Sequence, residues 1–385
     1  MRYKIHDKFY DLKDFSCIHP GGAEVFKYLE SNTNVTPIIY SYHKNPENII
    51  NKLSKYEIPL NNTVIKYDTL YTYDKYNELK KLVYSEMHNK KIPFFWSNTE
   101  IITNFILICL YFATWAYCFI NADELSDWWM VVLSIMFVSF CLLIGHETAH
   151  HTGLKNQRYN NIIARILSVP NFSLNHWYYN HNYLHHCFTN TENDSDFSYG
   201  KLALRYSPNH KLYFHHKFQF LYIPFICILN GYNQSLRLNL KYLNVDAILF
   251  ISLLLYTFGF FKVFLLFGST GFLYTFIVNL SHIQEDCVLN NTEYKNDFLC
   301  NQITSSINYK TSFPFSRLIC FGLDIQIEHH VFPNIPHSSL RQIKPIVQKY
   351  CNENNIKYIE KSSIFSAIYS YIVYIYKMGS KIFLK

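Results

Sequence analysis

Long apolar segments, free or almost free of charge, constrain the fold of this chain more than any other feature. A helix that crosses a bilayer needs about 20 mostly apolar residues. Four segments approach this length, and two tryptophans open the second, where interfacial aromatic residues are common. They are residues 101–120, 128–145, 246–261 and 263–281, with the last two forming a tight pair hinged near Gly259 and Lys262. The sequence therefore predicts an all-α integral-membrane domain of four helices.

Charged residues around these segments predict the orientation in the membrane. The loop between the first two carries Asp123, Glu124 and Asp127 but no Lys or Arg, whereas the long segment between the second and third carries nine Lys and Arg residues. Because basic loops stay in the cytoplasm, both chain ends and the long polar segment are expected on the cytosolic side.

The overall composition excludes several classes of protein. Charged residues make up only 16% of the chain, and the basic residues behind the net charge of +7 are scattered, which disfavours a nucleic-acid partner. The ten cysteines form no C-x-x-C pair, so neither a disulfide scaffold nor a zinc ribbon is expected.

Three histidine clusters lie at the cytosolic edges of the apolar segments. Histidines four apart on a helix share one face, and the next residue points about 100° away, so it can serve a second metal ion. Imidazole suits iron, copper, zinc and nickel, and eight such ligands suit two ions. The clusters are His146, His150 and His151 in GHETAHH, His181, His185 and His186 in HNYLHH, and His329 and His330 in QIEHH, with His282 as a ninth candidate.

Other interpretations of these histidines are weaker. HETAH matches the H-E-x-x-H motif of zinc proteases, but Asn156 stands where the extended motif needs a third histidine. Di-iron carboxylate bundles need two Glu-x-x-His pairs, and Glu147 to His150 supplies only one. Isolated histidines are interpreted as hydrogen-bonded polar residues; these are His6, His88, His176, His210, His215, His216 and His337.

The motifs GHETAHH, HNYLHHCFTN and QIEHHVFP resemble the three histidine boxes of membrane fatty-acid desaturases, and the Gln that opens the third box resembles the front-end branch. The resemblance covers roughly residues 95–345; Glu147 replaces the usual Asp of the first box. It implies two non-haem irons held by His146, His150, His151, His181, His185, His186, His282, His329 and His330, with Gln326 in the catalytic site. It also implies that Asp194, Asp196 and Asn190 orient these ligands.

A second resemblance lies near the N-terminus. His19 begins the motif HPGG, and His43 follows 24 residues later in SYHKN. By itself HPGG could be a structural turn. With the second histidine, and with FYDLKDF ahead of it, residues 1–60 resemble a small α+β cytochrome b5 domain, although the strand and helix that usually precede Tyr3–Tyr10 are missing. The resemblance implies haem b ligated by His19 and His43, which passes electrons and does not activate O2.

Together these features predict a cytochrome b5-like domain at 1–60, a linker at 61–94, a desaturase domain at 95–345 with a cytosolic histidine-box cap, and an amphipathic helical tail at 346–385. The expected activity is O2-dependent insertion of a cis double bond into an unsaturated acyl chain, carried by CoA or phospholipid, between an existing double bond and the carboxyl end. Electrons are expected from NAD(P)H through a separate cytochrome b5 reductase, since no G-x-G-x-x-G fingerprint is present. The expected location is the endoplasmic reticulum membrane.

Three alternatives stay open at this point. A sphingolipid long-chain-base desaturase shares the haem module and the Gln of the third box. A lipid hydroxylase uses similar ligands. The third alternative is a non-enzymatic, haem-binding membrane protein that carries electrons.

Overall fold

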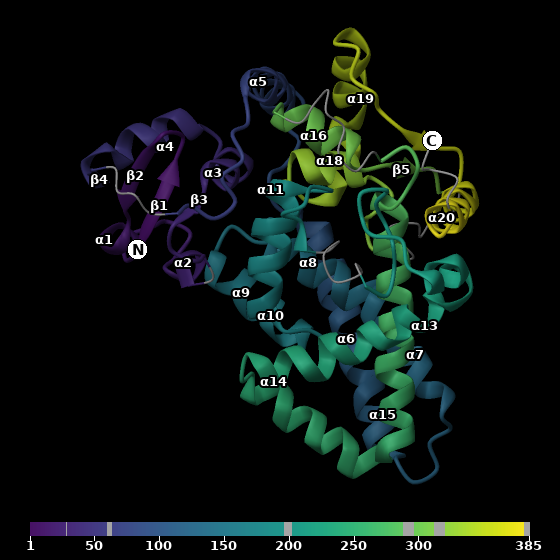
Figure 1. The fold of residues 1–385 in the computed structure, drawn as a ribbon. Coiled ribbons are helices and arrows are strands. Elements are labelled where there is room, and N and C mark those ends of the chain that lie inside the picture. Colours follow the sequence, from purple (N-terminus) through teal and green to yellow (C-terminus); the bar gives the residue numbers. More distant parts are fainter. Residues whose placement is uncertain (28, 60–63, 196–201, 288–295, 312–319, 381–385) are drawn as a thin grey trace.

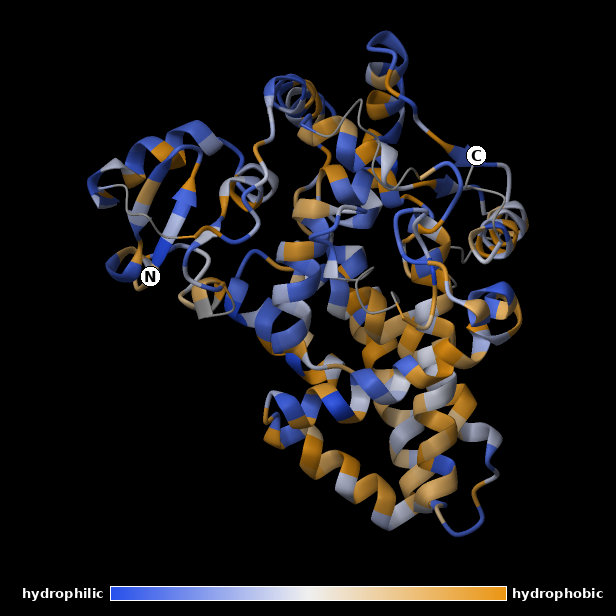
Figure 2. Cartoon of the chain, viewed as in Figure 1, coloured by the Kyte–Doolittle hydropathy of each residue, from blue (hydrophilic) through white to orange (hydrophobic). Residues whose placement is uncertain are grey.

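The computed structural model describes residues 1–27, 29–59, 64–195, 202–287, 296–311 and 320–380. Figure 1 shows three parts: apolar helices at one end, a layer of shorter helices above them, and a small sheet with its own helices to one side. Hydrophobic residues are concentrated in the first part (Figure 2). The chain is thus mostly helical, as predicted.

Within the described residues, three helical elements are long and apolar enough to cross a membrane. The first, α6, begins with a capping box in which Ser97 and Glu100 satisfy each other's backbone N–H groups. The second is continuous through a π-helical stretch. The elements are α6 (Asn98–Ile120), α7 (Trp128–Met136) with η2 (Phe137–Leu142) and α8 (Leu143–Ala149), and α15 (Val245–His282).

The predicted third and fourth spans are the two arms of the single element α15. The chain bends at Gly259, which has φ 74° and ψ 170°, and the helix resumes immediately after it. Glycine adopts such a positive φ without a steric penalty. The predicted pair of apolar helices hinged near Gly259 is therefore present, as the two arms of α15 (Figure 1).

A further apolar helix packs tightly against α15. Gly231 of α13 lies so close to Gly271 that a Cβ on either residue would collide with the other helix backbone. Small residues at such a crossing let two helices approach in a bilayer. The helical segment that contains α13 comprises η4 (Phe214–Phe218), α13 (Gln219–Tyr232), η5 (Asn233–Leu238) and α14 (Asn239–Lys241).

The polar layer above the membrane helices is built from short helices. Its core contains the apolar face of α5, with Tyr76, Leu79 and Val83 fully buried, so much of the segment expected to be a linker packs as part of this layer. The elements are α5 (Asp74–Asn89), α9 (Gln157–Ser168), α10 (Leu174–Trp177), η3 (Tyr178–His185), α11 (His186–Phe188), α16 (Phe298–Thr304), β5 (Asn308–Tyr309), α18 (Gln326–Val331), α19 (His337–Glu353) and β6 (Glu360–Lys361).

The last helix, α20 (Ile364–Met378), is amphipathic, as the sequence predicts. Tyr371 and Ile375 are buried against α13 and α15, whereas Phe365 and Tyr369 are more than 70% exposed. Exposed aromatic residues on a helix beside membrane spans fit a position at the lipid interface.

The N-terminal part is a four-stranded sheet in the order β3-β1-β2-β4, with β1 and β2 forming an antiparallel hairpin. Helices α3 and α4 each begin with a proline in the first turn, where no backbone donor is lost. The elements are β1 (Arg2–Ile5), β2 (Lys8–Asp11), α1 (Lys13–Ser16), α2 (Glu24–Lys27), β3 (Thr33–Asn34), α3 (Thr36–Tyr42), α4 (Pro46–Leu53), η1 (Ser54–Tyr56) and β4 (Glu57–Ile58).

Candidate functional site

The structure brings eight of the predicted histidines into two neighbouring groups. In each group, one nitrogen of every imidazole lies within 4.8 Å of one nitrogen of every other. We call them group 1 and group 2. Group 1 is His146, His150, His181, His186 and His329, and group 2 is His185, His282 and His330.

Four separate parts of the chain supply these side chains. The end of α8 supplies His146 and His150, and the junction of η3 and α11 supplies the second box. His282 is the last residue of α15, and α18 supplies the third box. The ends of α8 and α15 and the short helices α11 and α18 therefore bring their histidines together at one site. Figure 1 shows these elements next to one another, above the apolar helices.

The histidines of the second box, HNYLHH, are divided between groups 1 and 2 differently from the prediction. An α-helical period places His181 and His185 on one face, yet His181 is grouped with His186 and His185 belongs to the other group. The reason is that Tyr178–His185 is π-helical, and its wider turn joins residues five apart. In the first box, where Leu143–Ala149 is α-helical, His146 and His150 share a group as predicted.

His151 lies outside both groups of described residues. It follows the end of α8 and has φ 62°, which turns it off the helix. Its ring stacks on Tyr178, and burial lowers its pKa to about 4. The side chain lines a cavity on the N-terminal side of the site instead of joining the predicted ligand set.

The spacing of the imidazole nitrogens fits metal ions. Nε2 of His181 lies 3.1 Å from Nε2 of both His146 and His186, and Nε2 of His282 lies 3.2 Å from Nε2 of His330. Two nitrogens bound to one ion at about 2.0–2.1 Å are roughly 2.8–3.4 Å apart at right or tetrahedral angles. Several buried ring nitrogens of group 1 also lack a hydrogen-bond partner among the described residues. Both observations fit a di-metal centre.

Five of the imidazoles outside the membrane helices are held neutral. Burial keeps the pKa values of His150, His186 and His329 well below the usual range, because the charged form loses its hydration, and the neighbouring imidazoles add to this. The same holds for the pKa values of His181 and His330. A neutral imidazole has the free lone pair that a metal ion requires.

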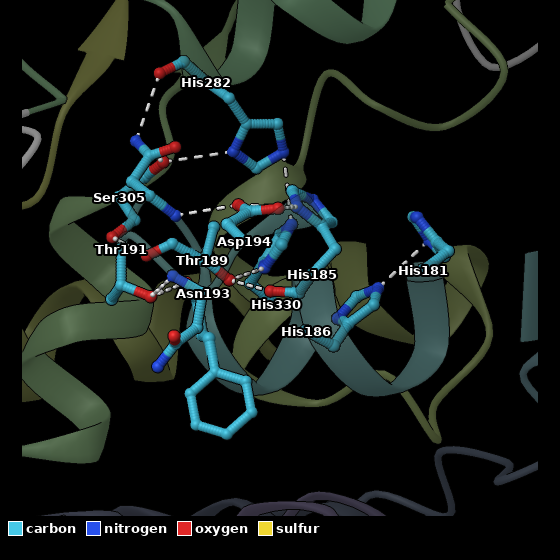
Figure 3. Close-up of polar contacts among 12 residues, drawn as sticks. His181, His185, His186, Thr189, Thr191, Asn193, Asp194, His282, Ser305 and His330 are labelled. Atoms are coloured by element: carbon cyan, nitrogen blue, oxygen red, sulfur yellow. Dashed lines mark hydrogen bonds and ion pairs between the residues drawn. The ribbon is translucent and has the colours of Figure 1, made fainter. Parts of the chain in front are cut away.

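Every member of group 2 is oriented by a hydrogen bond at Nδ1. Figure 3 draws those of His185 with Asp194 and of His282 with Ser305. Nδ1 of His185 lies 3.0 Å from Asp194, Nδ1 of His282 donates to the Ser305 carbonyl at 3.1 Å, and Nδ1 of His330 lies 3.2 Å from the Gln302 side-chain oxygen. Such partners fix the ring and raise the basicity of Nε2. The backbone N–H of Asn190 donates to Asp194, and its side chain donates to the carbonyls of His282 and Ser305.

Group 1 is oriented mainly by ring packing. Trp177 stacks on His181 with centroids 4.3 Å apart and meets His146 and His150 edge to face. His337 stacks on His329 at 5.1 Å. A hydrogen bond to a residue outside the group adds to this packing, at 2.8 Å between Nδ1 of His150 and the hydroxyl of Tyr42.

The structure places the predicted residue Gln326 beside group 2 but does not describe Asp196. The Gln326 side-chain nitrogen lies 3.0 Å from Nε2 of His282, and its oxygen is buried without a partner among the described residues, so it adjoins group 2. Asp196 lies outside the residues that the structure describes.

Sequence reasoning missed a buried chain of contacts behind group 1. The Glu147 carboxylate accepts hydrogen bonds from the indole N–H of Trp96 and from the backbone and ring of His337. His337 was interpreted as an isolated polar residue because it stands outside the third box. Sequence reasoning also missed Trp177, which stacks on His181. Its position four residues before His181 was an available signal, since residues at this spacing lie close on a helix.

The predicted haem ligands face one another in the N-terminal part. The ring centroids of His19 and His43 are 6.0 Å apart, and both line a mostly apolar cavity of about 670 Å³. Nδ1 of His43 donates to the Ile39 carbonyl, which leaves its Nε2 lone pair for an iron, whereas Nδ1 of His19 accepts the backbone N–H of Gly21. Burial lowers the pKa of His43 to about 4 and that of His19 as well, so both imidazoles are neutral. These residues fit a haem with two axial histidines.

Comparison with known proteins agrees with the metal centre. The fatty acid desaturase family model matches residues 126–362, which include every histidine of both groups. Acyl-lipid (8-3)-desaturase B of Dictyostelium discoideum is 24% identical over 98% of this chain and 90% of its own length. The sn-1 linoleoyl-lipid 6-desaturase of Synechocystis sp. is 29% identical over 65% of this chain and 79% of its own length.

Delta(5) fatty acid desaturase A of Dictyostelium discoideum is 24% identical over 98% of this chain and 90% of its own length. No solved structure matches the chain. With a family match over more than half of its residues and a buried, two-part histidine site at the ends of its apolar helices, this chain belongs to the fatty acid desaturase family and is an oxidoreductase.

Proposed function

We propose that the protein is a front-end acyl desaturase that receives electrons through its own cytochrome b5-like domain. The observation that carries the activity is the pair of convergent histidine groups at the ends of the apolar helices. The reaction removes two hydrogens from adjacent carbons of an acyl chain. With one O2, two electrons and two protons it yields a cis double bond and two waters.

Two non-haem irons, when bound to groups 1 and 2, supply the oxidant for an unactivated C–H bond, which protein side chains alone cannot attack. The protein holds the ligands neutral by burial and orients them through Asp194, Gln302 and Trp177. The apolar wall below group 1, with Phe137, Leu142 and Phe172 beside His146, keeps water from the acyl chain.

The front-end regiochemistry rests on two supports. One is Gln326 beside group 2, in the position that resembles the third box of front-end enzymes. The other is the names of the relatives, among them an (8-3)-desaturase, a Delta(5) desaturase and a 6-desaturase. The same names favour a lipid-linked acyl chain over a sphingoid base as substrate.

Electron supply is proposed through haem b held by His19 and His43. A haem bound there would supply single electrons, with a separate NAD(P)H-dependent cytochrome b5 reductase as its electron donor. Because this reductase is expected to be cytosolic, we propose that the histidine groups face the cytosol from the endoplasmic reticulum membrane. The facing imidazoles and the apolar cavity support the haem site.

Expression in a host without polyunsaturated acids, fed with one unsaturated acid at a time, tests the activity. We expect a new cis double bond between the existing one and the carboxyl end, located by gas chromatography and mass spectrometry. The inactive control is His330→Ala. New bonds confined to long-chain bases, or a hydroxylated product without alkene, would contradict the proposal.

A spectrum of the purified full-length chain tests the haem site. We expect about one low-spin haem per chain, lost in His43→Ala and kept in His88→Ala, which changes an exposed histidine of α5. Product formation without any haem absorbance would show that electrons arrive by another route.

A further inference from the structure

The cavity proposed for haem is lined by two parts of the chain. On one side it is lined by His19, His43 and the apolar core of the N-terminal sheet. On the other side it is lined by His150, His151 and Tyr178 of the histidine-rich layer. The haem cavity and group 1 therefore share a wall.

Tyr42 crosses this wall. It is the residue directly before the proposed haem ligand His43, and its hydroxyl lies 2.8 Å from Nδ1 of His150 in group 1. The Tyr42 and His150 rings are almost parallel, with 14° between their planes. Nε2 of His150 has no partner among the described residues, which leaves its lone pair for a metal ion in group 1. In that tautomer Nδ1 carries the proton and donates to the phenol oxygen of Tyr42.

The segment that carries Tyr42 and His43 is fixed to the histidine-rich layer. The buried ammonium group of Lys80, on α5, donates to the carbonyls of Tyr40 and His43 at the end of α3. Asn334, four residues after His330, donates to the Tyr42 carbonyl at 3.4 Å. These contacts from Lys80 and Asn334 hold the end of α3 against the histidine-rich layer. The distance from Tyr42 to His150 is therefore fixed by packed elements and does not depend on a flexible linker.

We propose that Tyr42 is the contact through which single electrons leave the haem site for group 1. This inference rests on the proposed haem function. The path runs along the backbone from His43 to Tyr42 and across one hydrogen bond to His150. In each transfer one ferrous haem becomes ferric and one ferric non-haem iron becomes ferrous. Two transfers supply the two electrons of one desaturation, and the NAD(P)H-dependent reductase restores the ferrous haem each time. Tyr42 keeps its proton and acts as a positioning residue.

Tyr42→Phe in the full-length holoenzyme tests this path, because it removes the hydrogen bond and keeps the ring. The matched control is Tyr40→Phe, on the same helix, whose hydroxyl bonds to Glu47 and His6 within the N-terminal part. The measurement is anaerobic stopped-flow: the haem is reduced while the non-haem iron is ferric, and its reoxidation is followed at the Soret band. We expect Tyr42→Phe to slow reoxidation about 10-fold, the usual size of an effect at a ligand's outer partner, and Tyr40→Phe to leave it unchanged.

Haem and iron content, with the low-spin haem spectrum, show whether each variant is intact. Tyr42→Leu, which removes both the hydroxyl and the ring, is expected to be at least as slow as Tyr42→Phe. Wild-type reoxidation rates in both variants, with full haem and iron, would overturn this inference alone. A wild-type chain that binds no haem would overturn the haem part of the proposed function, and this inference with it.

Discussion

Groups 1 and 2 contain the same kind of side chain but are oriented by different forces. In group 2, each of the three imidazoles has a hydrogen-bond partner at Nδ1. In group 1, the Nδ1 atoms of His146, His186 and His329 have none among the described residues, and aromatic rings hold the imidazoles in place. Hydrogen bonds fix both the direction and the protonated nitrogen of a ring, whereas packing fixes only the direction.

The difference implies that group 2 is the more rigid metal site. A ligand held by a carboxylate or a carbonyl is preorganised and more basic, so its metal is released less readily. Group 1 has more histidines but depends on well-packed neighbours. It is also the group that the N-terminal part contacts, through Tyr42.

Removing one ligand from each group should have the largest effect. His329 and His330 are adjacent in α18 but belong to different groups. We expect His329→Ala and His330→Ala each to lower product formation more than about 100-fold, beyond the loss typical of an outer partner, and to retain about one iron instead of two. Iron analysis and lipid chromatography check this, with His88→Ala as control. Loss of both irons in both variants would show that the groups are not separate sites.

Asp194→Asn should weaken group 2 selectively. The change removes the charge that orients His185 but keeps the size of the side chain. We expect about 10- to 100-fold weaker iron binding at one site, with a parallel loss of activity, measured by iron titration. Glu192→Gln, an exposed change in the same turn, is the control. Equal loss of iron from both sites would contradict the proposed difference in how groups 1 and 2 are oriented.

The sequence predicted what depends on local pattern. It predicted the histidines, the apolar helices and the bend at Gly259, because ligand type, hydropathy and glycine content are visible residue by residue. It did not predict how the second box divides, because that depends on the π-helical turn at Tyr178–His185, and an α-helical period was assumed.

Contacts between distant parts of the chain could also not be predicted from the sequence. Tyr42 and His150 are 108 positions apart, and Glu147 and His337 are 190 apart. Nothing in a single sequence pairs such residues.

Trp177 variants should test whether packing alone orients group 1. Trp177→Ala removes the ring that contacts His146, His150 and His181, and we expect about 10-fold lower activity with iron lost from group 1. Trp177→Phe keeps a flat ring and should retain most of the activity. Iron analysis of both variants checks the order. A Trp177→Phe variant as weak as Trp177→Ala would show that the indole itself, and not the packing, is required.

The smallest predicted effect concerns Glu328, which lies in α18 directly before His329 and His330. Its carboxyl accepts hydrogen bonds from Asn308 and Tyr358, and burial raises its pKa from 4.5 to about 7. Below pH 4.5 the group is protonated in both folded and unfolded states. Between pH 4.5 and 7 only the unfolded chain ionises, so the contribution of Glu328 to stability falls as the pH rises, by about 3 kcal/mol at most.

Glu328→Gln isolates this contribution, because glutamine keeps the shape but does not titrate. We expect the melting temperature of the wild type, relative to Glu328→Gln, to fall as the pH is raised from 4.5 to 7, while the exposed change Glu353→Gln shows no such trend. Since α18 carries His329 to group 1 and His330 to group 2, any iron that Glu328→Gln releases should come from both groups. Iron lost from group 1 alone would mean that the hydrogen bonds of group 2 hold His330 even when its helix loosens, which would sharpen the contrast between the groups.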